Sequence, residues 1–267
     1  MALIGAAFGI GFTFGPLLGA GFVTDDASGV PSAMPGYIAS GLSGLALLSA
    51  IFVLGESLNP DSKPTGHGWL DLASLKRAVG RPAIALILLT IFLTTFAFAQ
   101  FETTLALLTK RLGMSLRDNF YVFAYIGFLL TLCQGMIVRR LVPRVGEYRM
   151  AMAGVTLMTT GMLMVGVAAQ QESRAMLFSV LPVTVLGFSA LTPSLQALLS
   201  LRTPDSEQGG TLGLGQSVSA MSRILGPAVG MPLFEMGTTL PYWTAAGVLL
   251  VGIVLVGLLK TQPTVAA

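Results

Sequence analysis

Apolar residues form long runs along the chain, and short polar or charged clusters separate them. Eight runs carry almost no charge and are long enough, at 1.5 Å per residue, to cross the roughly 30 Å hydrocarbon core of a bilayer. They comprise residues 2–22, 35–54, 82–109, 119–138, 149–168, 175–200, 211–235 and 240–259. Because these runs are apolar on every side, they lack the alternation of a membrane β-barrel strand. The pattern predicts an all-α, polytopic membrane protein with eight transmembrane helices.

The composition supports a lipid environment and argues against several classes of metal, catalytic and nucleotide-binding site. Hydrophobic side chains make up 54% of the 267 residues and charged ones 10%, against about 25% charged residues in an ordinary soluble domain. The single Cys133 and the single His67 provide too few partners for a zinc site or a Cys/His nucleophile. No Gly-rich loop ending in Lys-Ser/Thr is present, so ATP is not expected as an energy source. We therefore expect no cofactor and no metal.

Basic residues lie at the ends of the apolar runs rather than along one stripe, which argues against a nucleic-acid partner. Alternate connections differ in their basic content, and basic connections remain in the cytoplasm. One set holds Lys63, Lys76, Arg77, Arg81, Arg139, Arg140, Arg144, Arg149, Arg202 and Lys260. The other set holds Lys110, Arg111, Arg117 and Arg174. The difference predicts a multi-pass protein of the plasma (inner) membrane with both termini in the cytoplasm, although the arginines from Arg139 to Arg149 would also suit an anionic-lipid patch.

One long polar connection divides the chain. Residues 56–81 contain the helix breakers Asn59-Pro60, Lys63-Pro64 and Thr65-Gly66, followed by an amphipathic stretch over 70–79. Six predicted helices follow the connection, which is the size of one transporter half. We therefore expect residues 1–55 to be the last two helices of an N-terminal bundle, 56–81 a cytoplasmic linker and 82–267 a six-helix C-terminal bundle.

Two helices that start on the same side contain the same pattern of small residues and proline. The small residues lie four apart, and a proline follows the middle glycine in both helices. The first pattern is Gly11, Gly15, Pro16 and Gly19, and the second is Ser222, Gly226, Pro227 and Gly230. Small side chains at this spacing let a neighbouring helix approach closely, and the proline bends the axis. Two such copies predict parallel repeats related by an axis along the membrane normal, with the patterned faces at a seam between moving bundles.

These patterns resemble the major facilitator superfamily, and within it the drug:proton antiporters of the tetracycline-resistance type. The segment from Gly11 to Gly19 is similar to the motif that marks antiporters in the fifth helix of that family. The segment from Gln134 to Gly146 resembles the basic turn between helices eight and nine, with Arg139, Arg140 and Arg144 as its basic residues. The resemblance implies that the eight predicted helices correspond to family helices five to twelve, so that the first four are missing.

Two departures from the family qualify the resemblance. Pro143 stands where the family often has an aspartate in the basic turn, and nothing in the chain corresponds to the ionisable residues of the first four helices. The chain is therefore expected either to be a truncated product or to begin at a start site that was set too late. A complementary helix bundle, or a second chain, is an expected partner besides the lipid bilayer.

Ionisable groups inside the apolar runs are few, and each is a candidate because a charge in hydrocarbon costs at least about 2.5 kcal/mol. Glu102 could exchange a proton with either side of the membrane, and the alternative is a hydrated carboxylate that pairs with Lys110 or Arg111. Arg223 could contact a substrate, and the alternative is a structural pair beside the Gly-Pro bend. Neutral hydrogen-bonding groups in the same helices are Gln100, Gln134 and Gln216.

The function favoured by these residues is secondary active transport, with efflux of a small organic compound or drug against inward protons. Three alternatives stay open. The chain could be a non-transporting membrane remnant or scaffold, it could transport another solute such as a sugar or metabolite, or it could be a membrane-embedded enzyme. The enzyme is the weakest of these because no cluster of His, Cys or paired acids lies at one membrane depth.

Overall fold

The computed structural model of the 267-residue chain describes residues 2–22, 33–55, 80–204 and 207–260, and all regular elements in these ranges are helices. In chain order they are α1 (Ala2–Gly21), α2 (Met34–Val53), α4 (Pro82–Arg111), α5 (Leu116–Leu132), the π-helix η1 (Cys133–Val138), α6 (Arg139–Val145), α7 (Glu147–Gln170), α8 (Arg174–Leu201), α9 (Gln208–Met236) and α10 (Leu240–Leu259). The all-α class predicted from the apolar runs is thus observed. Most of the predicted linker, including its amphipathic stretch, lies outside the described residues.

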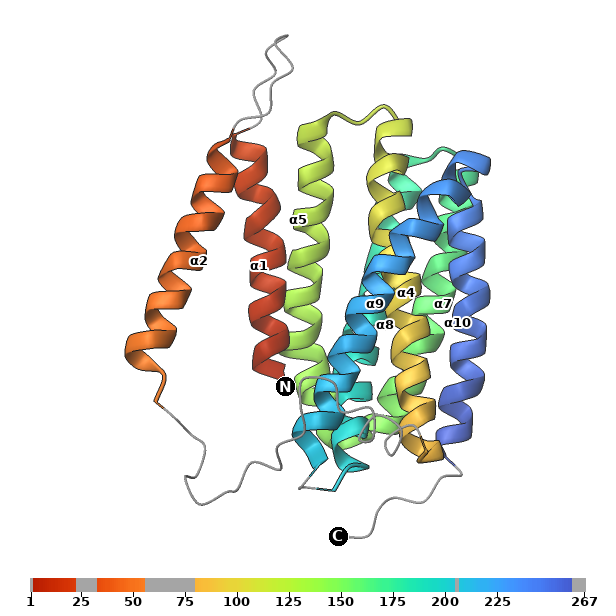
Figure 1. The fold of residues 1–267 in the computed structure, drawn as a ribbon. Coiled ribbons are helices and arrows are strands. Elements are labelled where there is room, and N and C mark those ends of the chain that lie inside the picture. The colour runs from red at the N-terminus through yellow and green to blue at the C-terminus, as the bar shows by residue number, and fades with distance from the viewer. Residues whose placement is uncertain (1, 23–32, 56–79, 205–206, 261–267) are drawn as a thin grey trace.

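The helix boundaries follow the apolar runs closely, because in lipid every backbone group must be satisfied within its own segment. Six of the helical segments are long and apolar enough to cross a membrane: α2, α4, the continuous rod from α5 to α6, α7, α8 and α10. Helices α1 and α9 have comparable lengths, with 20 and 29 residues, and run beside the others (Figure 1). The number of eight spans remains a prediction from the sequence.

The helices from α4 to α10 form the main bundle, and α1 lies along its edge beside α5 (Figure 1). Helix α7 packs along α8, α4 packs along α9 and α10, and α10 also packs along α7. Glycines permit the tightest of these contacts, since Gly154 of α7 faces the backbone of Leu191 and Gly187 of α8 faces that of Met158. Helix α1 packs along α5, whereas α2 has no buried residue.

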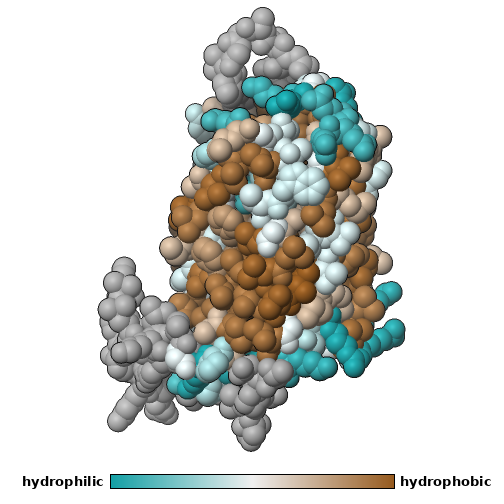
Figure 2. Space-filling view, turned by 90° about the vertical axis from the view of Figure 1, so that its right-hand side faces the viewer, coloured by the Kyte–Doolittle hydropathy of each residue, from teal (hydrophilic) through white to brown (hydrophobic). Residues whose placement is uncertain are grey.

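The two ends of the bundle are polar and the middle is apolar. The start of α1 and the end of α10 lie at the same end, at the bottom of Figure 1; we call this the lower end and the opposite one the upper end. Figure 2 shows an apolar band between hydrophilic rims on the side that it displays. The described residues place seven lysines and arginines near the lower end and four near the upper end. The lower set is Arg81, Arg139, Arg140, Arg144, Arg149, Arg202 and Lys260, and the upper set is Lys110, Arg111, Arg117 and Arg174.

Arginine side chains tie helix ends together at both rims. At the upper end, Arg174 at the start of α8 donates through Nε to the carbonyl oxygen of Leu112 at 2.8 Å and through Nη2 to that of Gly113 at 3.0 Å. At the lower end, Arg202 donates through Nη2 to the carbonyl oxygen of Leu259 at 2.9 Å. These donors satisfy carbonyl groups at helix C-termini that have no partner within their helix.

The predicted basic turn has a different local structure. Arg139, Arg140 and Arg144 lie on the helix α6, which continues the α5 rod, and the change of direction before α7 is concentrated at Gly146. Gly146 has φ +87°, a conformation that glycine adopts without the steric cost of a Cβ. The helix persists through the arginines because its other face is apolar: Val142 and Val145 pack on Val138, Met150 and Ala190.

Candidate site for substrate and proton binding

The two charged candidates lie on the packed helices α4 and α9. Glu102 is half-buried on α4, nine residues before the last residue of that helix, or about 14 Å at 1.5 Å per residue. Arg223 is exposed in the middle of the 29-residue α9. The positive charge of Arg223 acts on the Glu102 carboxylate. The structure thus brings the two predicted charges close enough to interact electrostatically.

Two glycines of the second repeat copy hold α9 against α4. A Cβ atom on Gly226 would lie 2.8 Å from Cβ of Ala99 and 2.9 Å from the backbone nitrogen of Gln100. A Cβ atom on Gly230 would lie 2.7 Å from Cγ of Gln100. Ser222 is fully buried one turn earlier, and its hydroxyl donates to the carbonyl oxygen of Val218. This copy of the pattern therefore mediates packing between α9 and α4, inside the six-helix part of the chain, while Pro227 lies within α9.

The first repeat copy has different surroundings. Gly19 is buried, and a Cβ there would lie 2.8 Å from the ring of Phe120 on α5. At Gly11 and Gly15 a Cβ would meet no described atom within 4 Å, and Pro16 is half-buried within α1. The two copies of the pattern therefore do not make equivalent contacts among the described helices. Whether their helices are related by a rotation about the membrane normal stays a prediction.

The closest approach of α1 to α5 uses two glycines outside the pattern. A Cβ on Gly127 of α5 would lie 2.5 Å from the backbone nitrogen of Thr13, and one on Gly9 of α1 would lie 2.9 Å from that of Thr131. Sequence reasoning missed both residues. The available signal was Gly127 itself, the single glycine of α5, since a glycine within a membrane helix often marks close backbone approach.

The three candidate glutamines have different neighbours. Gln100 is fully buried, and its Nε2 donates to the carbonyl oxygen of Pro241 at 3.1 Å and to Oγ1 of Thr244 at 2.9 Å, both on α10. Gln134 is buried in η1, which packs on α1 and α8. Gln216 is exposed on α9, seven residues and so two turns before Arg223 on the same helix face. Only Gln216 therefore shares a surface with one of the charged candidates.

A shallow recess begins one turn beyond Glu102 on the same face of α4. It has a volume of about 360 Å³ and is lined by Ala106, Lys110, Met114, Ser115, Leu116 and Asn119. Residues 102, 106 and 110 are spaced four apart and so lie above one another on a helix. The recess lies over the end of α4 and the start of α5, above Glu102, which is not one of its lining residues.

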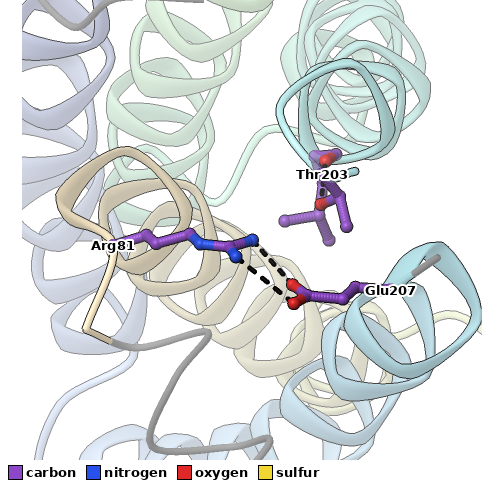
Figure 3. A network of polar contacts seen from close by, with 4 residues as sticks. Arg81, Thr203 and Glu207 are labelled. Atoms are coloured by element: carbon purple, nitrogen blue, oxygen red, sulfur yellow. Dashed lines mark hydrogen bonds and ion pairs between the residues drawn. The ribbon is translucent and has the colours of Figure 1, made fainter. Parts of the chain in front are cut away.

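A bidentate ion pair at the lower end joins the starts of the same two helices. Arg81 precedes α4 and Glu207 precedes α9, and the guanidinium lies 2.7 Å and 3.3 Å from the two carboxylate oxygens (Figure 3). Thr203 lies beside them at the end of α8 and donates to the carbonyl oxygen of Leu199. Sequence reasoning did not pair Arg81 with Glu207, because 126 positions separate them and only the tertiary structure places them together.

Comparison with known proteins places the whole chain in one family. The Major Facilitator Superfamily profile matches residues 1–227 and, in an overlapping second match, residues 140–266. The chain is 26% identical to Multidrug resistance protein 2 of Bacillus subtilis over all of its own length and 66% of that protein. It is 23% identical to the class B Tetracycline resistance protein of Escherichia coli, over 90% of this chain and 58% of that one.

Structural similarity agrees with the profile match. The crystal structure of the human organic anion transporter MFSD10 (TETRAN) superposes with a TM-score of 0.80 at 26% sequence identity, over 96% of this chain and 62% of that one. The chain thus spans about two thirds or less of the length of the relatives it matches. The helical architecture, the profile match and this superposition together assign the chain to the Major Facilitator Superfamily.

Proposed function

We propose that the chain works in secondary active transport, exchanging a small organic compound for protons at a site that contains Glu102 and Arg223. The observation that carries the proposal is the placement of these opposite charges on the packed helices α4 and α9, within electrostatic reach of one another. Charged groups at membrane depth are costly in hydrocarbon and occur mainly where they face a cavity, a substrate or a partner charge.

The two charges suit alternate occupation by a proton and a substrate. An ionised Glu102 interacts with Arg223 or attracts a cationic substrate, whereas a protonated Glu102 is neutral and does neither. A ligand shifts a two-state protein only by its differential affinity for the two states. Exchange follows if the substrate binds better when Glu102 is ionised, because proton and substrate then exclude one another, whereas better binding to the protonated form would give cotransport. Gln216, on the face of α9 that bears Arg223, adds a neutral hydrogen-bonding group.

The surroundings of Glu102 support a route for protons from the upper end. The recess over Ala106 and Lys110 lies one turn above Glu102 on the same face of α4, towards the upper rim. Because the lower rim carries more basic residues, the positive-inside rule makes the lower end cytoplasmic and the upper end external. With both helical ends of the chain at the lower side, we propose a plasma-membrane location with both termini in the cytoplasm.

The names of the relatives support small organic substrates. Multidrug resistance and tetracycline resistance describe proteins that act on such compounds, and organic anions are named for the human structure. The superfamily comprises transporters, so we propose no enzymatic activity. A cationic Arg223 exposed on α9 specifically favours an anionic organic compound as a second candidate substrate class.

Proton coupling can be tested in reconstituted vesicles. Vesicles that contain the chain are loaded with an aromatic dye, ethidium as a cation or fluorescein as an anion, and with a pH indicator. Dye leaving down its gradient should acidify the vesicle interior if each exit is exchanged for a proton. We expect this acidification for wild type and its loss in Glu102→Gln, with dye-for-dye exchange retained because exchange needs no net proton movement.

Glu235→Gln is the matched control, because Glu235 is an exposed acid near the end of α9 and is not part of the proposed site. It should acidify the vesicles as wild type does. Unchanged acidification in Glu102→Gln would refute the role of Glu102 in coupling. Release of neither dye by wild type, beyond protein-free vesicles, would refute transport of these compound classes by the chain alone. A preference for fluorescein that Arg223→Gln removes would support the anionic class.

A further inference from the structure

The long rod that contains α5 changes its hydrogen-bonding pattern in the middle of the membrane-length segment. Residues Cys133–Val138 form the π-helix η1 between α5 and α6. A π-turn is wider than an α-turn by one residue, is uncommon, and occurs mostly as a single turn at functional sites. Pro143 does not explain it, because the hydrogen bond that a proline removes is the one to the residue four earlier, Arg139, which already lies beyond η1.

The π-turn separates two parts of the rod whose main contacts differ. Above it, α5 packs chiefly along α1, with backbone approaches at Gly127 and Thr131, and has a smaller contact with α8. Below it, α6 is held to α7 and α8 by the apolar cluster of Val142 and Val145 with Val138, Met150 and Ala190. If α5 follows α1 while α6 stays with α7, the rod must bend between them, and η1 lies where the main contacts of the rod change.

Burial of the Gln134 side chain costs free energy in the observed arrangement. Gln134 is 7% exposed, and within the described part of the chain its Oε1 has no hydrogen-bond partner. A buried oxygen without a partner raises the free energy of the state that buries it. Next to it, a Cβ on Gly135 would meet no described atom within 4 Å, so the adjoining backbone has room to move. Both features favour opening of this junction to water.

We propose that η1 is the hinge at which the α5 rod bends when α1 moves relative to α7 and α8, and that Gln134 gains water when the hinge opens. This inference rests on the proposed transport function, since the hinge would serve the exchange between two states. In the closed state η1 packs on α1 and α8. In the open state α1 and α5 tilt away from α8 at the wide turn, which loosens the smaller contact of α5 with α8 while α6 keeps its contacts with α7.

The chain contains its own reporter for this movement. Cys133 is the only cysteine in the sequence, is the first residue of η1 and is 6% exposed. A maleimide reacts with the thiolate, which forms only where water reaches the sulfur. The rate of N-ethylmaleimide labelling of the wild-type chain in vesicles at pH 8 therefore measures how often the hinge opens. Cys133→Ser sets the background.

Deletion of Met136 should close the hinge. A π-turn contains one residue more than an α-turn, so the deletion converts η1 to regular α-helix and leaves α5 and α6 in register. Met136 is 53% exposed, so its removal loses little packing. We expect labelling to slow by at least about tenfold, which corresponds to about 1.4 kcal/mol in the opening equilibrium. Met136→Ala keeps the chain length and should label like wild type.

Gln134→Leu keeps the inference testable if the deletion variant fails to fold. Leucine removes the unpartnered oxygen, which stabilises the closed state and should also slow labelling. Labelling at the wild-type rate in both folded variants would overturn the hinge, and so would a native wild-type chain that is not labelled at all. Because no dye or pH gradient is used, these results are independent of whether Glu102 couples protons.

Discussion

Substituting alanine for Gly226 tests whether glycine is what lets α9 reach α4. The added Cβ would lie 2.8 Å from Cβ of Ala99, 2.9 Å from the backbone nitrogen of Gln100 and 3.0 Å from the carbonyl oxygen of Phe96. Favourable contacts between heavy atoms lie at about 3.5–4.0 Å, so α9 must withdraw by roughly 0.5–1 Å at this point. Two of the three atoms belong to the α4 backbone and cannot move aside by a change of rotamer.

The expected change in the free energy of unfolding follows from two opposing effects. Overpacking a tight interface costs about 1–3 kcal/mol, whereas replacing glycine by alanine within a helix gains up to about 1 kcal/mol. Gly213 lies on the same helix, and a Cβ there would meet no described atom within 4 Å. Gly213→Ala therefore isolates the helix-propensity gain. The stability of Gly226→Ala should fall below that of Gly213→Ala by about 1–3 kcal/mol.

Thermal unfolding of the two variants in the same detergent provides the comparison. A change of 1 kcal/mol shifts the melting temperature by about 2–4 °C in a chain of 150–250 residues, so we expect Gly226→Ala to melt about 2–12 °C below Gly213→Ala. Equal melting temperatures would refute the reasoning, because they would mean that α4 and α9 separate at no cost. Gly226→Leu should lie below Gly226→Ala, since the larger side chain demands a wider gap.

Three further substitutions test other contacts. The free energy of unfolding of Gln100→Leu should remain within about 1 kcal/mol of wild type, because the variant loses two hydrogen bonds but also removes the unpartnered Oε1. A much larger loss in thermal unfolding would show that the bonds to α10 stabilise the bundle. Gly127→Ala should destabilise the chain by about 1–3 kcal/mol, because its Cβ would meet the α1 backbone, whereas Gly135→Ala should not; equal effects would argue against the tight approach of α1 to α5. Arg81→Gln should cost at most about 1 kcal/mol, because both partners of its ion pair are 38% exposed, and the difference from wild type should shrink in 1 M salt; a difference that salt does not change would contradict a screened surface pair.

The hydrophobic pattern alone was sufficient for the fold class and for most helix boundaries, but not for the rod that continues past the run over 119–138 to Val145. The run over 82–109 became α4 (Pro82–Arg111), and the run over 240–259 coincides with α10. The reason is local: a segment in lipid has to satisfy its own backbone hydrogen bonds, so length and apolarity determine where a helix begins and ends. Family membership was also accessible, because small-residue and proline spacings belong to the sequence itself, and the profile match confirms it.

Side-chain neighbours, by contrast, depended on the tertiary structure. The repeated pattern was visible in the sequence, but only packing shows that Gly226 and Gly230 contact α4 and that Gly9 and Gly127, outside the pattern, bring α1 and α5 together. The charges of Glu102 and Arg223, and of Arg81 and Glu207, come together across more than 100 positions. A helix pattern specifies which residues share a face, but which face meets which neighbour is decided by close packing of whole helices. The π-turn at Cys133–Val138 likewise has no signal in hydropathy, since widening a turn by one residue leaves the composition of the run unchanged.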